Sequence, residues 1–194
     1  MKSREAVVGD SSFYIAFLSE DEIHDEGFLA SLLKRYNFFM GGKVVYNEIS
    51  RKNSESLKRI KLENLVELVD EYDYSALLSI IGDKVFEKGE YESVAIAYTK
   101  YIEGSLHSLI MDDRKARKWV EQNFSELKRF LRYSLRFLVN AYKVDRKITK
   151  DEVLHILSKV IASIEKGGRP FNLGKTGITL VEQLRKEVEQ SGEN

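Results

Sequence analysis

The alternation of short apolar runs with longer amphipathic segments is the feature that most constrains the fold of this chain. Four short runs are typical of buried strands: residues 5–10 (EAVVGD), 43–49 (KVVYNEI), 64–70 (NLVELVD) and 105–113 (SLHSLIMDD). The segments between them favour helices, which are predicted over residues 11–20, 25–40, 48–60 (with Asn47 as its cap), 74–86 and 90–102. Strands that alternate with helices form βαβ crossovers. The sequence therefore predicts the α/β class, with a mainly parallel sheet covered by helices on both faces.

The remainder of the chain follows a different pattern, which predicts helices alone. Residues 125–142 (SELKRFLRYSLRFLVNAY) place their leucines on one face of a single amphipathic helix. Further helices are predicted over residues 148–168 and 179–190. We therefore expect two units, an α/β domain over residues 1–120 and a helical extension over residues 121–194 that packs on it.

The charged residues are balanced in number but unevenly distributed. The chain has 31 Lys and Arg and 31 Asp and Glu, yet residues 1–113 are acidic and residues 114–150 are strongly basic. A basic region suggests a polyanionic partner, although a solvated basic helix fits this feature equally well. Because the chain has no cysteine, a metal ion would be held by oxygen or imidazole ligands. No membrane-spanning run or signal peptide is evident, so we expect a cytoplasmic protein.

Acidic side chains stand at corresponding places in the predicted sheet. They are Asp10, Glu48, Asp112 and Asp113 at strand ends, and Glu90 and Glu92 in the first turn of a helix. Ligands of open parallel sheets bind at the carboxyl ends of the strands, where gathered carboxylates would repel one another without a cation. Hard oxygen ligands suit Mg²⁺ or Mn²⁺, which can promote attack on phosphorus. The alternative is that each acid caps a helix, which is the commoner role for any one of them.

Four segments resemble the motifs of the PIN-domain ribonucleases in order and spacing: VVGDSSFYIAFL, KVVYNEI, KGEYESVAIAYTK and SLIMDDRKARKW. The last two are most similar to the subgroup with a Gly-Glu-x-Glu helix and an Asp-Asp-Arg-Lys motif. The resemblance covers about residues 5–120. It implies a three-layer α/β/α sandwich in which several acids hold Mg²⁺ or Mn²⁺ and hydrolyse RNA phosphodiester bonds.

The resemblance also implies roles for individual residues. Asp10, Glu48, Glu92 and Asp113 match the catalytic acids, with Glu90 and Asp112 as additional metal ligands, and Ser12 matches a hydroxyl that positions phosphate or water. The chain departs from the family pattern after Asp113, where residues 121–131 read as helix and a further short strand is expected in the family.

Basic residues after the last acid are candidates for RNA binding. Lys128, Arg132 and Arg136 recur every four residues of the predicted helix. They are joined as candidate phosphate contacts by Arg114, Lys115, Arg117 and Lys118. Tyr133 and Phe137 lie nearby, and at this spacing such rings more often belong to the core than to a base-stacking surface.

The segment GRPFNLGKTG superficially suggests a phosphate-binding loop, but Arg169 stands where that motif needs glycine and no apolar strand precedes it. The leading prediction is a metal-dependent endoribonuclease, acting in RNA processing or as the toxin of a toxin–antitoxin pair. A non-catalytic PIN-like module that binds RNA or protein is the alternative, and a deoxyribonuclease is a third option. RNA, an antitoxin or other protein, and a second copy of the chain are the expected partners.

Overall fold

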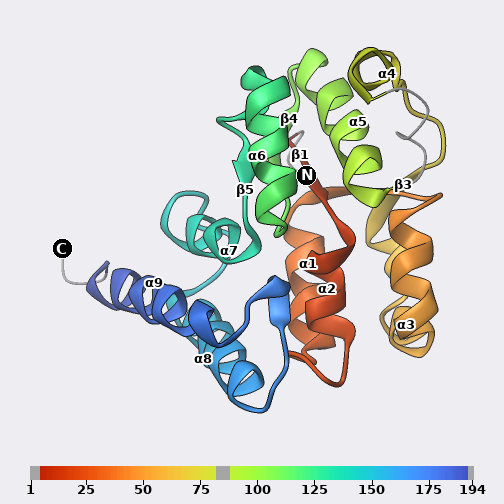
Figure 1. The fold of residues 1–194 in the computed structure, drawn as a ribbon. Helices are drawn as coiled ribbons and strands as arrows, with labels where there is room; N and C mark the ends of the chain where they lie inside the picture. The colour runs from red at the N-terminus through yellow and green to blue at the C-terminus, as the bar shows by residue number, and fades with distance from the viewer. Residues whose placement is uncertain (1–4, 82–87, 192–194) are drawn as a thin grey trace.

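The computed structural model describes residues 5–81 and 88–191, and its centre is a parallel β-sheet. The strands are β1 (Ala6–Gly9), β2 (Asn37–Gly41), β3 (Val66–Val69), β4 (Leu106–Ile110) and β5 (Leu131–Arg132). They pair in the order β3-β2-β1-β4-β5, and every pairing is parallel (Figure 1). The predicted α/β class is therefore confirmed.

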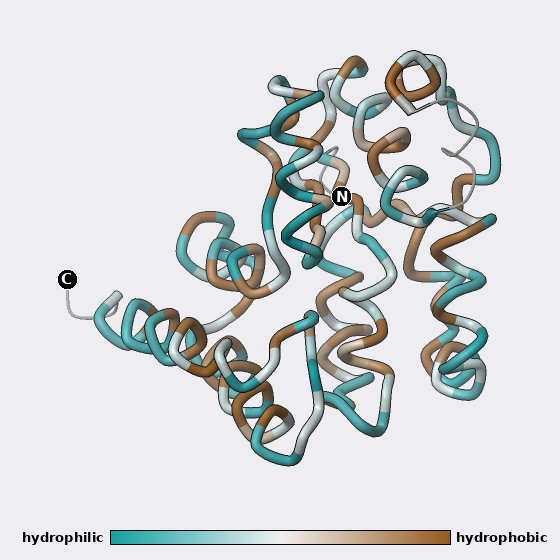
Figure 2. The backbone as a smooth tube through the Cα atoms, in the orientation of Figure 1, coloured by the Kyte–Doolittle hydropathy of each residue, from teal (hydrophilic) through white to brown (hydrophobic). Residues whose placement is uncertain are grey.

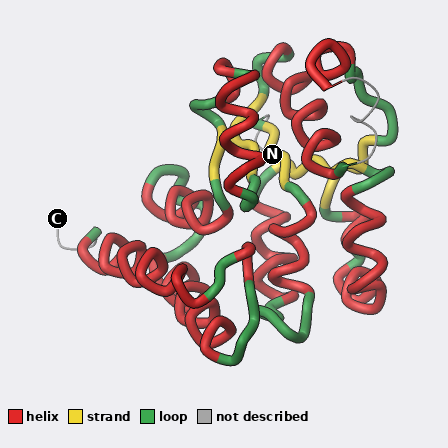
Figure 3. Tube along the Cα trace, viewed as in Figure 1, coloured by secondary structure: helices red, strands yellow, loops and turns green. Residues whose placement is uncertain are grey.

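Successive residues of a strand point to opposite faces of the sheet. Here both faces are apolar, and helices cover both. Val7, Phe38 and Ile110 belong to one core cluster, whereas Val8, Phe39 and Leu109 belong to the other. The first cluster is completed by α1 (Ser11–Leu18), α2 (Glu26–Arg35), α3 (Val45–Ile60) and α7 (Ser134–Lys143). The second is completed by α4 (Ser75–Ile81), α5 (Gly89–Ile102) and α6 (Arg114–Asn123). Figure 3 shows the strands enclosed by these helices, which make a three-layer α/β/α sandwich.

The second strand lies elsewhere than the sequence predicts. Residues 37–41, expected at the end of a helix, form β2 between β1 and β3, whereas Val45 and Glu48 lie in the first turns of α3. The run Phe38–Met40 is buried on both faces of the sheet, a pattern that the periodicity of the preceding helix obscures. Glycine is required at Gly41, since a Cβ atom there would meet the Glu92 carboxylate.

The predicted helix over residues 125–142 is also wrong. The chain instead makes a 3-10 turn at Ser125–Leu127, then β5, then α7. Strand β5 joins the sheet by pairing Leu131 with Leu109 of β4. A short strand therefore does follow the last acid, so the expected lack of such a strand is wrong. The division at residue 120 stays a prediction, although the sheet extends across it.

Two further helices, α8 (Lys150–Glu165) and α9 (Ile178–Gln190), pack on α7 and on each other. Helix α8 starts with a capping box between Thr149 and Glu152. Figure 2 shows apolar and polar residues alternating along both helices. The buried apolar ones belong to the same core cluster as residues of α1, α2, α3 and α7. Residues 82–86 of the helix predicted after β3 lie outside the described residues. Within the described part, no helix has both the length and the apolar character needed to cross a membrane.

Candidate functional site

Two buried aspartates from neighbouring strands meet at the carboxyl edge of the sheet. Asp10 directly follows β1, and Asp112 follows β4; they are only 5% and 8% exposed. The Ser12 hydroxyl donates to Asp10 Oδ1 at 2.7 Å and lies 3.2 Å from Asp112 Oδ2. The amide of Asp112 lies 3.3 Å from Asp10 Oδ2, so the two residues are in direct contact.

Each of these aspartates also caps a helix, as the alternative interpretation of the sequence expects. Asp10 accepts from the Phe13 amide at the start of α1. Asp112 accepts from the amide and hydroxyl of Ser134, at 2.8 and 2.5 Å, and so holds the start of α7. Capping and ligand binding are compatible, because a carboxylate has about four lone-pair positions.

The electrostatic environment of the pair favours a proton or a cation. Burial raises the pKa of Asp10, and the charge of Asp112 raises it further. Burial likewise raises the pKa of Asp112, although hydrogen bonds from Ser134 and Ser12 and the charge of Arg117 oppose the rise. Among the described residues, neither carboxylate forms a salt bridge. Arg117 donates its hydrogen bonds to the carbonyls of Met111 and Asp112 instead.

Beside this pair is a cavity of about 370 Å³ that we call the acidic cavity. It is lined by four of the predicted acids, each from a different element: Asp10 after β1, Glu48 in α3, Glu90 in α5 and Asp113 at the start of α6. Asp113 caps α6 through the Ala116 amide, 2.7 Å away. Glu48 and Glu90 are half-buried, and their carboxylates form no hydrogen bond or ion pair within the described residues. Their carboxylate oxygens are therefore available to a ligand. Gly89 lets Glu48 approach α5, because a Cβ atom there would lie 3.1 Å from Glu48 Oε2.

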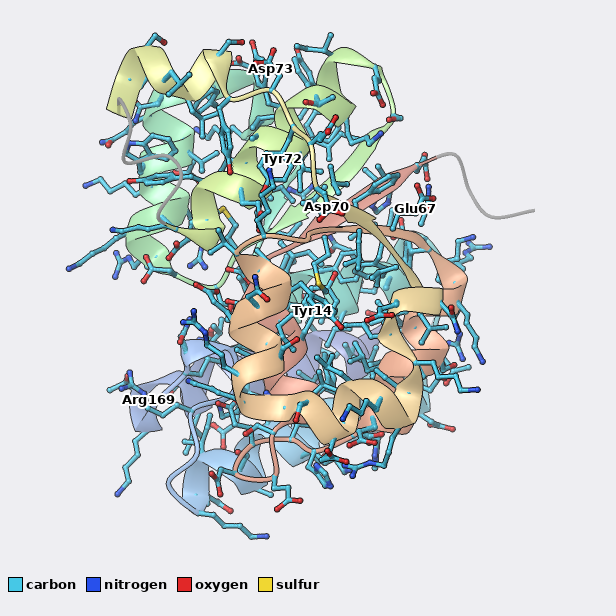
Figure 4. All side chains as sticks on the ribbon, turned by 90° about the vertical axis from the view of Figure 1, so that its right-hand side faces the viewer. Tyr14, Glu67, Asp70, Tyr72, Asp73 and Arg169 are labelled. Carbon is cyan, nitrogen blue, oxygen red and sulfur yellow. The ribbon has the colours of Figure 1, made fainter. Side chains whose placement is uncertain are left out.

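Three charged residues of the acidic cavity were missed in the sequence: Glu22, Lys52 and Arg169. Partial burial raises the pKa of Glu22, and the charge of Lys52 opposes that rise. Arg169 comes from the turn between α8 and α9, which the sequence marks only as a loop; Figure 4 labels it. The turn is held against α1 by the Phe171 ring, whose centroid lies 5.5 Å from that of Phe17. No spacing rule links these three residues to the acids, so only the tertiary structure reveals them.

Glu92, predicted as a catalytic acid, has a different environment. It is fully buried and does not line the acidic cavity. Its oxygens accept from the amides of Lys43, Val44 and Val45, at 2.7 to 3.1 Å, and from the Tyr72 hydroxyl, whose residue is labelled in Figure 4. Glu92 therefore caps α3 from a neighbouring helix, whereas Asn47, predicted as the cap, lies within the first turn of α3. The acid of α5 that faces the cavity is Glu90.

The predicted basic stripe is broken up by the turn and strand that replace its helix. Arg136 donates to Glu187 at 3.0 Å, and Arg132 donates to the carbonyl of Leu131. Lys128 lies in an exposed turn. Arg114, Lys115 and Lys118 are exposed on α6, directly after Asp113. Phe137 is a core residue, as its spacing favoured, and Tyr133 contacts Arg117, with the guanidinium 5.6 Å from the ring centroid.

The oxygen donors of the acidic cavity, which are carboxylates, hydroxyls and the Asn172 amide, fit a hard divalent cation, although Lys52 and Arg169 also line the cavity. As the side chains stand, no three acidic or histidine side chains within residues 5–81 and 88–191 are close enough together to enclose a metal ion. Glu48 and Glu90, on flexible side chains, are the residues that would close around it. The segment GRPFNLGKTG forms short 3-10 turns and follows a helix, unlike a phosphate-binding loop.

Sequence and structure comparisons do not assign the chain to a known group. Comparison with protein-family models, with curated proteins and with solved structures finds no match.

Proposed function

We propose that the protein is an endoribonuclease that depends on Mg²⁺ or Mn²⁺ and hydrolyses RNA phosphodiester bonds. The observation that supports this most is the acidic cavity itself, in which four carboxylates from four separate elements face one space. Next to it, neither carboxylate of the Asp10–Asp112 pair forms a salt bridge within the described residues, and the charge of Arg117 only partly opposes the raised pKa of Asp112. Asp10 and Asp113 cap helices, but the side chains of Glu48 and Glu90 accept no hydrogen bond within the described residues, so capping does not account for all four acids.

The residues that would hold the metal are Asp10, Glu48, Glu90 and Asp113. Asp112 would help to position Asp10, because its amide donates to Asp10 Oδ2. A divalent ion in this place would activate water and neutralise the charge that develops at phosphorus. Ser12 holds the two aspartates side by side and keeps the Asp10 carboxylate in one orientation.

The cavity also contains groups suited to bind a phosphate. Lys52 and Arg169 supply positive charge to its lining, and Arg114 and Lys115 add further positive charge on α6. The amino ends of α1, α5 and α6 lie at the same edge, and their dipoles favour an anion. These cations, rather than the predicted stripe of Lys128, Arg132 and Arg136, are the proposed phosphate contacts.

Cleavage of end-labelled RNA tests the proposal. We expect cleavage with Mn²⁺ or Mg²⁺, none with EDTA, and a loss of about 100-fold or more in Asp10→Asn. The matched control is Asp25→Asn, which changes an aspartate that caps α2 outside the acidic cavity and should leave cleavage unchanged. Wild-type cleavage rates in Asp10→Asn would contradict the proposal. Single-stranded and flap DNA offered in parallel would distinguish a deoxyribonuclease.

A second candidate is a non-catalytic module that binds RNA or protein. The observation in its favour is that no three acidic or histidine side chains in the described parts of the chain enclose a metal position. It predicts that RNA binding is independent of divalent ions and unaffected by Asp10→Asn. Roles in RNA processing or as an antitoxin-regulated toxin remain predictions for the same catalytic activity.

A further inference from the structure

A second cavity, of about 420 Å³, adjoins the acidic cavity and shares Glu90 and Asp113 with it. Its remaining wall comes from α5 and α6, which Figure 1 shows next to each other, and from the end of β4. The two shared acids thus form a common border between the acidic cavity and this second space. A molecule that crosses the border would occupy both.

The second cavity has the chemistry of a base-binding site. Tyr91 and Trp119 are half-buried and meet edge to face, with ring centroids 5.2 Å apart and planes inclined by 62°. Met111 and Ala116 add apolar surface. Flat aromatic rings of this kind stack on nucleobases.

Positive charge stands at the same cavity. Lys88 and Lys115 belong to its lining, and the Lys88 ammonium lies 6.0 Å from the centroid of the Tyr91 ring. Aromatic surface combined with cations is the pattern by which proteins hold single-stranded nucleic acid, the rings taking bases and the cations taking phosphates. An apolar peptide would not need the two lysines.

From these observations we infer that the second cavity binds one unpaired nucleobase of the strand whose phosphate occupies the acidic cavity. The inference rests on the proposed nuclease function and adds the substrate class, which is single-stranded RNA or an unpaired loop. A base within a duplex is stacked and paired, and cannot enter a cavity lined by Tyr91 and Trp119.

Trp119 is the only tryptophan of the chain, so its fluorescence reports on this cavity directly. The Asp10→Asn protein, with Mg²⁺ present, is titrated with a six-residue oligouridylate and, in parallel, with a base-free sugar-phosphate chain of equal length. We expect saturable quenching by the oligouridylate and little by the base-free chain. Anisotropy of a fluorescein-labelled oligouridylate measures binding independently.

Substitutions then separate stacking from charge. Trp119→Ala should weaken binding by roughly 5- to 150-fold, whereas Trp119→Phe, which keeps a flat ring, should stay within about threefold of the parent protein. Because Trp119 also contacts Phe124, thermal unfolding of each variant shows whether the fold is retained. Lys115→Ala, on an exposed side chain, should weaken binding about twofold to fivefold and reduce its salt dependence.

The outcomes separate this inference from the proposed activity. Binding of the oligouridylate without a change in Trp119 emission, or equal quenching by the base-free chain, would each overturn the base site. Cleavage of RNA by the wild-type protein without such quenching would support the nuclease proposal and refute the base site. Base-dependent quenching without any cleavage would support the base site and refute the catalytic proposal.

Discussion

Asp10 and Glu92 are both buried acids near the same edge of the sheet, and both cap a helix, yet their surroundings are opposite. Glu92 accepts hydrogen bonds from three backbone amides and a tyrosine hydroxyl, so its charge is fully compensated by the protein. Asp10 faces a second carboxylate, and its pKa is raised by burial and by that charge. The comparison teaches that burial alone does not identify a ligand-binding acid. The charge that faces the acid does, because Asp10 also accepts hydrogen bonds from the Ser12 hydroxyl and from the Phe13 and Asp112 amides.

The largest expected effect on stability is at Glu92. Glu92→Gln removes the charge and turns an NH₂ group towards amides that need an acceptor, so we expect a loss of about 2–4 kcal/mol in the free energy of unfolding. Urea denaturation followed by circular dichroism measures it. Gly41→Ala should have a similar effect, because its Cβ atom would displace the same carboxylate. A Glu92→Gln protein that is as stable as wild type but inactive would instead make Glu92 a catalytic acid.

A smaller effect of opposite sign is expected at Asp10 in the absence of metal. Since its folded pKa is raised above the unfolded value of about 4, the folded state binds more protons in the interval between them, and stability falls as pH rises through it. Asp10→Asn abolishes this charge and keeps the oxygen that caps α1, although it removes the hydrogen bond from the Asp112 amide. We expect it to stabilise the protein by about 1–2 kcal/mol at pH 8 and by less at pH 5.

Urea denaturation in EDTA at the two pH values measures this difference, and adding Mn²⁺ sharpens it. Mn²⁺ should stabilise the wild type at pH 8 by up to about 2.7 kcal/mol at a concentration 100 times the dissociation constant, and the Asp10→Asn protein far less. A destabilised Asp10→Asn protein at pH 8, with no response of the wild type to Mn²⁺, would show that Asp10 is compensated like Glu92.

The smallest effect is expected at Asp25, the cap of α2. Burial opposes its ionisation, but hydrogen bonds from Lys159, the Phe28 amide and His155 hold its pKa below the ordinary value. Its contribution is therefore present above about pH 4 and lost as pH falls further. Asp25→Asn should cost about 0.5–1 kcal/mol at pH 8, since the ion pair is partly exposed. An Asp25→Asn protein that is more stable than wild type at pH 8 would show that the charge of Asp25, like that of Asp10, destabilises the fold.

Much of the fold was predictable because local patterns determine it. The apolar runs around Val7 and Leu109 and the helices over residues 11–18 and 89–102 appear where the sequence predicts them. The errors share one cause. The stretches that become β2 and β5 are buried only because neighbouring strands cover them, and alone they continue the helical period of the adjacent segments.

The sequence by itself determined the α/β class and the placing of acids at strand and helix ends, since both follow from residue order and the geometry of a parallel sheet. Only the tertiary structure decided which acids line one cavity and which already accept hydrogen bonds from backbone amides. In the folded chain, Glu90 and not Glu92 lines the acidic cavity, and Arg169 reaches it from the turn between α8 and α9. The physical reason is that the availability of a carboxylate depends on the donors and charges that folding brings to it, and these come from residues far away in the sequence.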